Sequence, residues 1–141
     1  MHVGVCRFAV LVPHSHSLKD KRAVVRKLRD RVRERFAVGL VEVGGQDTWQ
    51  RAELAFAVLT GERDAALAAV AAVVGFVADQ GLGEVAAVRR EVVGYGDDWF
   101  AGAEPWHPAA VPGALADAGA DADWLPAAWR DGREDGGGGR G

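Results

Sequence analysis

The chain has 141 residues, with 17 Lys and Arg against 20 Asp and Glu, and a formal net charge of −3. Its one cysteine, Cys6, excludes an intrachain disulfide and a zinc site built from cysteines. The longest apolar stretch, residues 65–78, falls short of the roughly 20 residues that span a bilayer. We therefore expect a soluble, cytoplasmic protein without a membrane partner.

Composition and charge change near residue 95. Residues 1–95 contain 14 Lys and Arg against 11 Asp and Glu, whereas residues 96–141 contain 3 against 9 and are dominated by Ala, Gly, Asp and Pro. Segments of low hydrophobicity cannot bury enough apolar surface to fold. The sequence predicts a mildly basic folded domain over residues 1–95 and an acidic, disordered tail over residues 96–141.

The first part of the domain predicts a strand followed by a helix. Residues 2–12 alternate their side chains between two mostly apolar faces, a pattern typical of a central strand. Pro13 ends this strand, Ser17 stands at an N-cap position, and Asp20 follows three residues later, as in a capping box. A helix is therefore predicted over residues 18–36, with apolar residues recurring along one stripe.

The rest of the domain predicts a hairpin, a second helix and a last strand. Residues 38–43 and 51–60 are two strands joined by a short link, which makes them antiparallel. A helix over residues 64–80 and a strand over residues 84–93 complete the order βαββαβ. This order predicts an α+β, ferredoxin-like split β-α-β fold. Its four-stranded antiparallel sheet has the first and third strands in the centre, because crossovers are right-handed, and both helices cover one face.

The uncovered face of this sheet is predicted to carry apolar side chains. They come from the two central strands: Val3, Val5, Ala9, Leu11, Ala55, Ala57 and Leu59. An exposed apolar patch of this kind marks a partner or self-association site. Two covers stay open, namely a second copy of the chain, which would form a homo-oligomer, and the acidic tail with its tryptophans.

Two separated motifs occur in order within residues 1–95. SLKDKR opens the first helix and DTWQRA ends the hairpin link, and the motif residues are Ser17, Leu18, Lys19, Lys21, Arg22, Asp47, Trp49, Gln50, Arg51 and Ala52. On these motifs the chain resembles the YlxP-like family of small bacterial proteins, a domain-of-unknown-function family. The resemblance supplies no enzymatic activity, catalytic residue or cofactor. Because genes of the family lie among genes for translation initiation and ribosome maturation, the resemblance implies an accessory role around ribosomal RNA.

The first helix also segregates its charges. By helical periodicity, five cations fall on one flank beside the apolar stripe: Lys19, Arg22, Arg26, Arg29 and Arg33. Arginine side chains bind phosphate oxygens bidentately, and cations in line at helical rise can follow a nucleic-acid backbone. We therefore predict that these five residues contact phosphates in a noncatalytic RNA- or ribosome-associated factor, whose partner is ribosomal RNA or a ribosomal subunit. The competing interpretation is a merely solvated charged face.

The alternative function is a ferredoxin-like small-ligand module or enzyme with its site at the hairpin. Asp47, Gln50 and Arg51 would then converge on a ligand. Side chains facing a shared cleft would favour this alternative, whereas Arg51 directed at Glu53 would favour a structural role.

No metal or cofactor is predicted. His14 and His16 are close in sequence but lack a third nearby ligand, and the loop before an N-cap explains them equally well. Cys6 lies on the predicted core face of its strand, which suits a small hydrophobe better than a nucleophile. No catalytic triad order, P-loop lysine or dinucleotide-binding glycine pattern is present.

Overall fold

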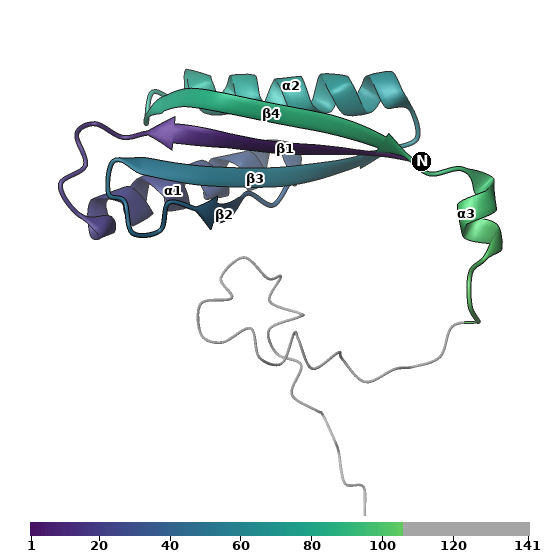
Figure 1. Ribbon diagram of the computed structural model, residues 1–141. Helices are drawn as coiled ribbons and strands as arrows, with labels where there is room; N and C mark the ends of the chain where they lie inside the picture. The colour runs from purple at the N-terminus through teal and green to yellow at the C-terminus, as the bar shows by residue number, and fades with distance from the viewer. Residues whose placement is uncertain (106–141) are drawn as a thin grey trace, which may run out of the picture. The chain divides into compact units, whose positions relative to one another are not determined.

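Four strands form one antiparallel sheet in the computed structural model, which describes residues 1–105. The elements follow the predicted order (Figure 1): β1 His2–Leu11, α1 Leu18–Phe36, β2 Val41–Gly44, β3 Arg51–Thr60, α2 Arg63–Asp79, β4 Glu84–Gly94 and a short α3 Asp97–Ala101. The predicted disorder of the tail falls largely on residues 106–141, which lie outside the described residues, and it stays a prediction.

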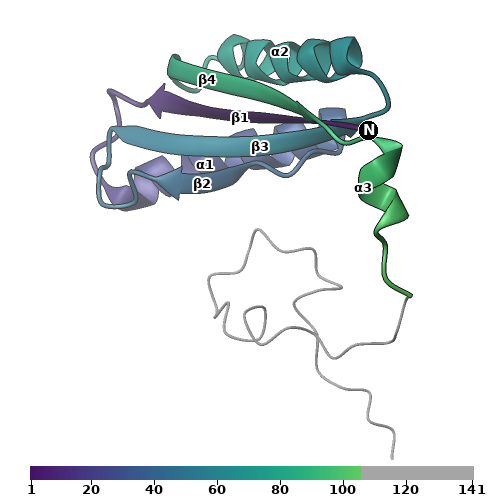
Figure 2. The same ribbon diagram turned by 45° about the vertical axis from the view of Figure 1, so that its right-hand side comes forward.

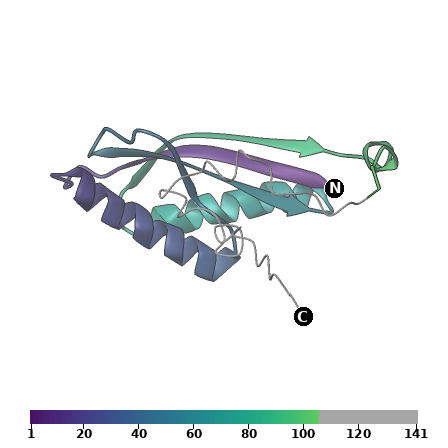
Figure 3. The ribbon, with the colours of Figure 1, turned by 90° about the horizontal axis from the view of Figure 1, so that it is seen from below.

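The sheet order is β2-β3-β1-β4, so the first and third strands are central. β1 pairs with β3 from His2 opposite Thr60 to Leu11 opposite Arg51, and β4 flanks the other side of β1. Helices α1 and α2 lie on the same face of the sheet, as Figures 2 and 3 show from two directions. The predicted ferredoxin-like α+β fold is therefore confirmed.

The core lies between this face and the two helices. Alternate residues of β1 and β3 point into it, as the period of two predicts, and they meet one stripe of each helix. Its members include Cys6, Phe8, Val10, Leu54, Phe56, Val58, Val25, Leu28, Val32, Val70, Val73 and Val77. The rings of Phe8 and Phe56 meet edge to face with centroids 6.2 Å apart, which joins the two central strands.

Two segments differ from the prediction. β2 begins at Val41 rather than at residue 38, because Ala37 takes a left-handed conformation (φ 54°) that turns the chain out of α1 before it joins the sheet. Beyond residue 95, where the domain was predicted to stop, α3 carries two aspartates in its first turn, which suits the positive end of a helix. Tyr95 and Trp99 pack edge to face, with centroids 5.4 Å apart.

Candidate nucleic-acid interface

Helix α1 starts at a side-chain cap. The Ser17 hydroxyl oxygen accepts a hydrogen bond from the Asp20 backbone N–H at 3.1 Å, which confirms the predicted N-cap. The Asp20 carboxylate accepts from the backbone N–H of His16, one residue before the cap, at 3.1 Å. The loop before α1 and the first turn of α1 are therefore fixed to each other, and with them the orientation of the side chains in that turn.

Lys21, in that first turn, is only 1% exposed. Its ammonium nitrogen lies 2.5 Å from the carbonyl oxygen of Gly45 and 3.3 Å from that of Gln46. It also lies 3.2 Å from the carboxylate of Glu42, whose side chain is largely buried. A buried ammonium is tolerated only when it is paired and hydrogen-bonded. A lysine of the first motif is therefore bound to the turn between β2 and β3, directly before the residues of the second motif.

The turn between β2 and β3 is held at both of its ends. At its start, Gly45 has a φ of 71° and its carbonyl oxygen accepts from the Thr48 N–H at 3.0 Å. At its end, the Gln50 side-chain amide donates to the carbonyl oxygen of Pro13 at 3.4 Å, and the Gln50 carbonyl accepts from the Val12 N–H at 2.8 Å. Between these anchors, Asp47 and Trp49 are exposed.

The hairpin residues proposed as a small-ligand site point to different partners. Gln50 reaches the loop before α1, whereas the Arg51 guanidinium lies 3.5 Å from the carboxylate of Glu53. Glu53 also pairs with Arg7 of β1, and this hydrogen bond holds the pKa of its carboxyl below the ordinary value. The arrangement favours a structural role for Arg51, and convergence of Asp47, Gln50 and Arg51 on one ligand stays an untested prediction.

The five predicted phosphate-binding cations follow one flank of α1. Four of them are exposed and Arg29 is half-buried, with its Nε enclosed and without a hydrogen-bond partner in the described part of the chain. Arg31, on the opposite flank, donates to Gln80 just after α2 at 2.9 Å, so the five cations face away from α2. Within residues 1–105 none of them forms an ion pair, since the observed pairs involve Arg7, Lys21 and Arg51. We call Lys19, Arg22, Arg26, Arg29 and Arg33 the basic stripe.

The uncovered face of the sheet divides into two halves. Near the start of β1 it exposes Val5, Leu59 and Val93, with Leu59 at 67%. Further along, the ion pairs of Glu53 occupy it. Ala9 was predicted to be exposed there, but it is only 2% exposed. Its small side chain lies between two cross-strand neighbours, Ala86 on β4 and the larger Glu53 on β3, which cover it. The apolar patch is therefore confined to one half of the face.

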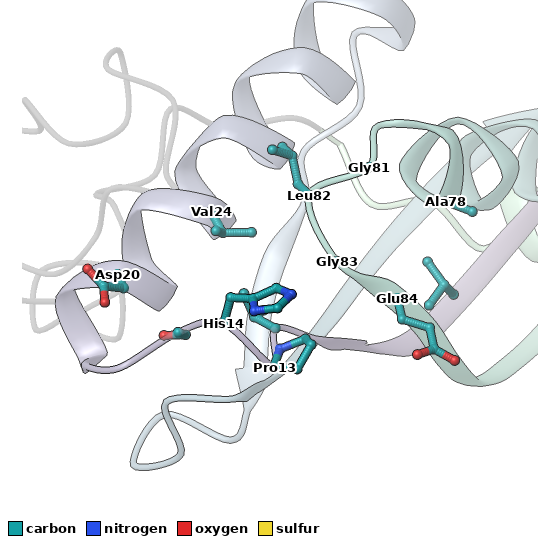
Figure 4. Close-up of a pocket in the computed structure, with 12 residues that line it drawn as sticks. Pro13, His14, Asp20, Val24, Ala78, Gly81, Leu82, Gly83 and Glu84 are labelled. Atoms are coloured by element: carbon teal, nitrogen blue, oxygen red, sulfur yellow. The ribbon is translucent and has the colours of Figure 1, made fainter.

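A pocket of about 670 Å³ opens between the loop before α1 and the loop before β4. Figure 4 shows His14, Asp20 and Glu84 around it, with Val24 and Leu82 among its apolar walls. His16 does not line the pocket. Among residues 1–105 no group of three His, Cys, Asp or Glu side chains could hold a metal ion. The pocket lies on the flank of α1 away from the basic stripe.

The fold and topology define a ferredoxin-like α+β domain. The family model described as "Protein of unknown function (DUF503)" matches residues 3–90, and the chain belongs to this family. It is similar to the "Uncharacterized protein YlxP" of Bacillus subtilis (strain 168), at 36% identity over 61 residues. The aligned part covers 43% of this chain and 66% of the relative, just under two thirds of its length. The YlxP-like resemblance is confirmed.

Sequence reasoning missed two contacts of the motif regions. Lys21 was placed in the family motif without a structural role, although it lies four residues before the core residue Val25 on the same helix face. That position inside the apolar stripe was the available signal for burial. The pairing of Arg7 with Glu53 had no comparable signal, because it depends on the register between β1 and β3.

No helix among residues 1–105 combines the length and apolarity needed to cross a membrane.

Proposed function

We propose that this protein is a noncatalytic, cytoplasmic factor that associates with ribosomal RNA or a ribosomal subunit through the basic stripe of α1. The observation that supports this function is that five cations follow one helix flank without a carboxylate partner among residues 1–105. From Lys19 to Arg33 the stripe extends about 21 Å at the rise of an α-helix. A line of unneutralised cations of this length suits several consecutive phosphates.

The chemistry of the stripe fits a row of phosphates. Four of its five members are arginines, whose planar forks bind phosphate oxygens bidentately. Contacts to phosphate position a protein on RNA without reading its sequence. Each neutralised phosphate also releases a counterion, so affinity falls steeply as salt rises.

The test compares two double variants of the same helix. Arg22→Gln/Arg26→Gln removes two exposed cations of the basic stripe, whereas Lys27→Gln/Arg35→Gln removes two exposed cations outside it. Binding is measured by cosedimentation with purified ribosomal subunits and with deproteinised ribosomal RNA at graded salt. We expect the stripe variant to bind at least 10-fold more weakly. The slope of log affinity against log salt concentration should also become shallower by about 1.4, because two phosphate contacts are lost and each accounts for about 0.7.

The control double variant is expected to bind nearly as the unmodified chain does. Equal weakening by both variants would mean that only net charge matters and would contradict a specific interface. Binding with an unchanged salt slope in the stripe variant would remove the proposed function.

We further propose that a second copy of the chain covers the apolar half of the open sheet face. Exposed Val5, Leu59 and Val93 support this. Leu59→Asp should then yield a monomer in analytical ultracentrifugation, whereas Val43→Asp, an exposed valine on the edge strand, should leave the oligomer intact. A monomeric unmodified chain at micromolar concentration would refute self-association.

A further inference from the structure

Trp49, at the tip of the hairpin, is 50% exposed. A half-exposed indole is a large apolar and aromatic surface left in contact with water, and such residues are typical anchors of binding sites. Its neighbour Asp47 is also exposed and makes no side-chain hydrogen bond or ion pair within residues 1–105. Packing within the domain therefore does not account for these two side chains.

The tip is also held in place on both sides. Lys21 binds the carbonyl oxygens of Gly45 and Gln46 before it, and Gln50 is bound to Val12 and Pro13 after it. Only three residues lie between these anchors. The fixed positions of the anchors reduce the conformational entropy lost on binding, which raises affinity without additional contacts. Trp49 is therefore displayed on a preorganised turn.

The tip adjoins the start of the basic stripe. Lys19 and Arg22 lie in the same turn of α1 as Lys21. The ammonium nitrogen of Lys21 lies 2.5 Å from the carbonyl oxygen of Gly45 in the turn between β2 and β3. In Figures 1 and 3 the β2–β3 turn and the beginning of α1 lie at the same end of the sheet, opposite the chain's N-terminus and α3. An RNA strand along the stripe would therefore pass the exposed indole as it leaves the helix.

We propose that Trp49 is a stacking platform for one unpaired base of an RNA strand whose phosphates lie along the basic stripe. This inference rests on the proposed function and adds the class of RNA that the site takes. Aromatic side chains beside a cationic track are the usual means of binding single strands, because every base has a π-face. Asp47 can accept a hydrogen bond from a ribose 2′-hydroxyl or from an exocyclic base amine, and base pairing occupies such an amine in a duplex.

The experiment measures fluorescence anisotropy with the full chain and two labelled probes. One probe is a 12-nucleotide oligouridylate and the other a 12-base-pair blunt RNA duplex. The variants are Trp49→Ala, Trp49→Phe and, as a matched control, Trp99→Ala, which removes an indole of 57% exposure at the opposite end of the sheet. Circular dichroism and thermal melting check that each variant is folded.

We expect Trp49→Ala to weaken oligouridylate binding about 10-fold or more, at the scale of one base stacked on an aromatic ring. Trp49→Phe should restore most of the affinity. Duplex binding should not change, and the salt slope of Trp49→Ala should match that of the unmodified chain, because stacking releases no counterions. A merely structural role for the indole would instead weaken both probes together.

Three results would overturn the inference. Unchanged oligouridylate binding by Trp49→Ala, with loss of binding in the stripe variant Arg22→Gln/Arg26→Gln, would remove the stacking platform and leave the proposed function standing. Equal losses from Trp49→Ala and Trp99→Ala would point to a general aromatic effect. No binding of either probe or of ribosomal RNA by the unmodified chain would remove both proposals, and Trp49 would then be assigned to a protein partner.

Discussion

The ammonium nitrogen of Lys21 lies 2.5 Å from the carbonyl oxygen of Gly45. This contact connects the first turn of α1 to the turn between β2 and β3, across a separation of 24 residues in the sequence. With Glu42 at 3.2 Å it forms a buried polar cluster beneath the hairpin. The first turn of α1 therefore helps to fix the turn that carries Trp49.

Lys21→Met is expected to destabilise the domain by about 3 kcal/mol. The change leaves the Glu42 carboxylate and the carbonyls of Gly45 and Gln46 without their cation, and removal of one partner from a buried pair is strongly destabilising. Urea unfolding followed by circular dichroism measures the free energy of unfolding. Lys19→Met, an exposed lysine in the same helical turn, should stay within about 0.5 kcal/mol of the unmodified chain. Equal effects of the two substitutions would contradict the assigned role.

Glu53→Gln is expected to have a pH-dependent effect on stability. The hydrogen bond from Arg7, with a smaller contribution from Arg51, lowers the pKa of the folded Glu53 carboxyl below its ordinary value of 4.5. The stabilisation is therefore fully present above about pH 4.5 and is lost as the pH falls through the lower folded value. Urea midpoints between pH 7 and pH 3 should show the variant less stable at pH 7 and the difference closing in acid.

Glu91→Gln is the control for this pH series. Glu91 lies on the same sheet face, opposite Val5 in the register, and forms no ion pair within the described part of the chain. Its substitution should change the free energy of unfolding by about the same amount at pH 7 as at pH 3. A Glu53→Gln difference that is constant from pH 7 to pH 3 would show that the pairing with Arg7 contributes nothing.

Cys6 is expected to react slowly with thiol reagents in the folded chain. Burial raises the pKa of its thiol, although the positive charge of Arg90 acts in the opposite direction. Both the low thiolate fraction and the lack of access oppose reaction. Ellman's reagent at pH 8 should label the native chain far more slowly than the urea-unfolded chain. The variant Cys6→Ala/Ala68→Cys, with its thiol on an exposed position of α2, should react at once in both states.

Gly4→Ala and Gly75→Ala are expected to change stability in opposite directions. A Cβ at Gly4 would lie 2.8 Å from Val70 Cγ2 and 3.0 Å from Val58 Cγ2, so the contact between β1 and α2 must open, at a cost of about 1–3 kcal/mol. A Cβ at Gly75 of α2 meets nothing within 4 Å, and alanine there should gain about 0.8 kcal/mol in helix propensity. Thermal melting of both variants checks the sign. A gain from Gly4→Ala would mean that α2 does not pack against β1 as closely as described.

The candidate interface was only partly predictable. Helical periodicity alone placed Lys19, Arg22 and Arg26 on one flank of α1, and the structure leaves all three exposed. The same periodicity gave no partner for Lys21, and alternation in β1 placed Ala9 on the uncovered face without showing that its neighbours enclose it. Faces follow from local geometry, whereas burial within a face depends on the size and register of residues from other strands.

The sequence by itself determined the order of the elements, the faces of β1 and β3 that enter the core, and the cap at Ser17, because periodicity and capping act within a few residues. The tertiary structure decided which residues surround the ammonium of Lys21, how Glu53 divides its carboxylate between Arg7 and Arg51, and where Trp49 is displayed. These outcomes require segments far apart in the chain to dock at one register, and no local pattern encodes the distance between them.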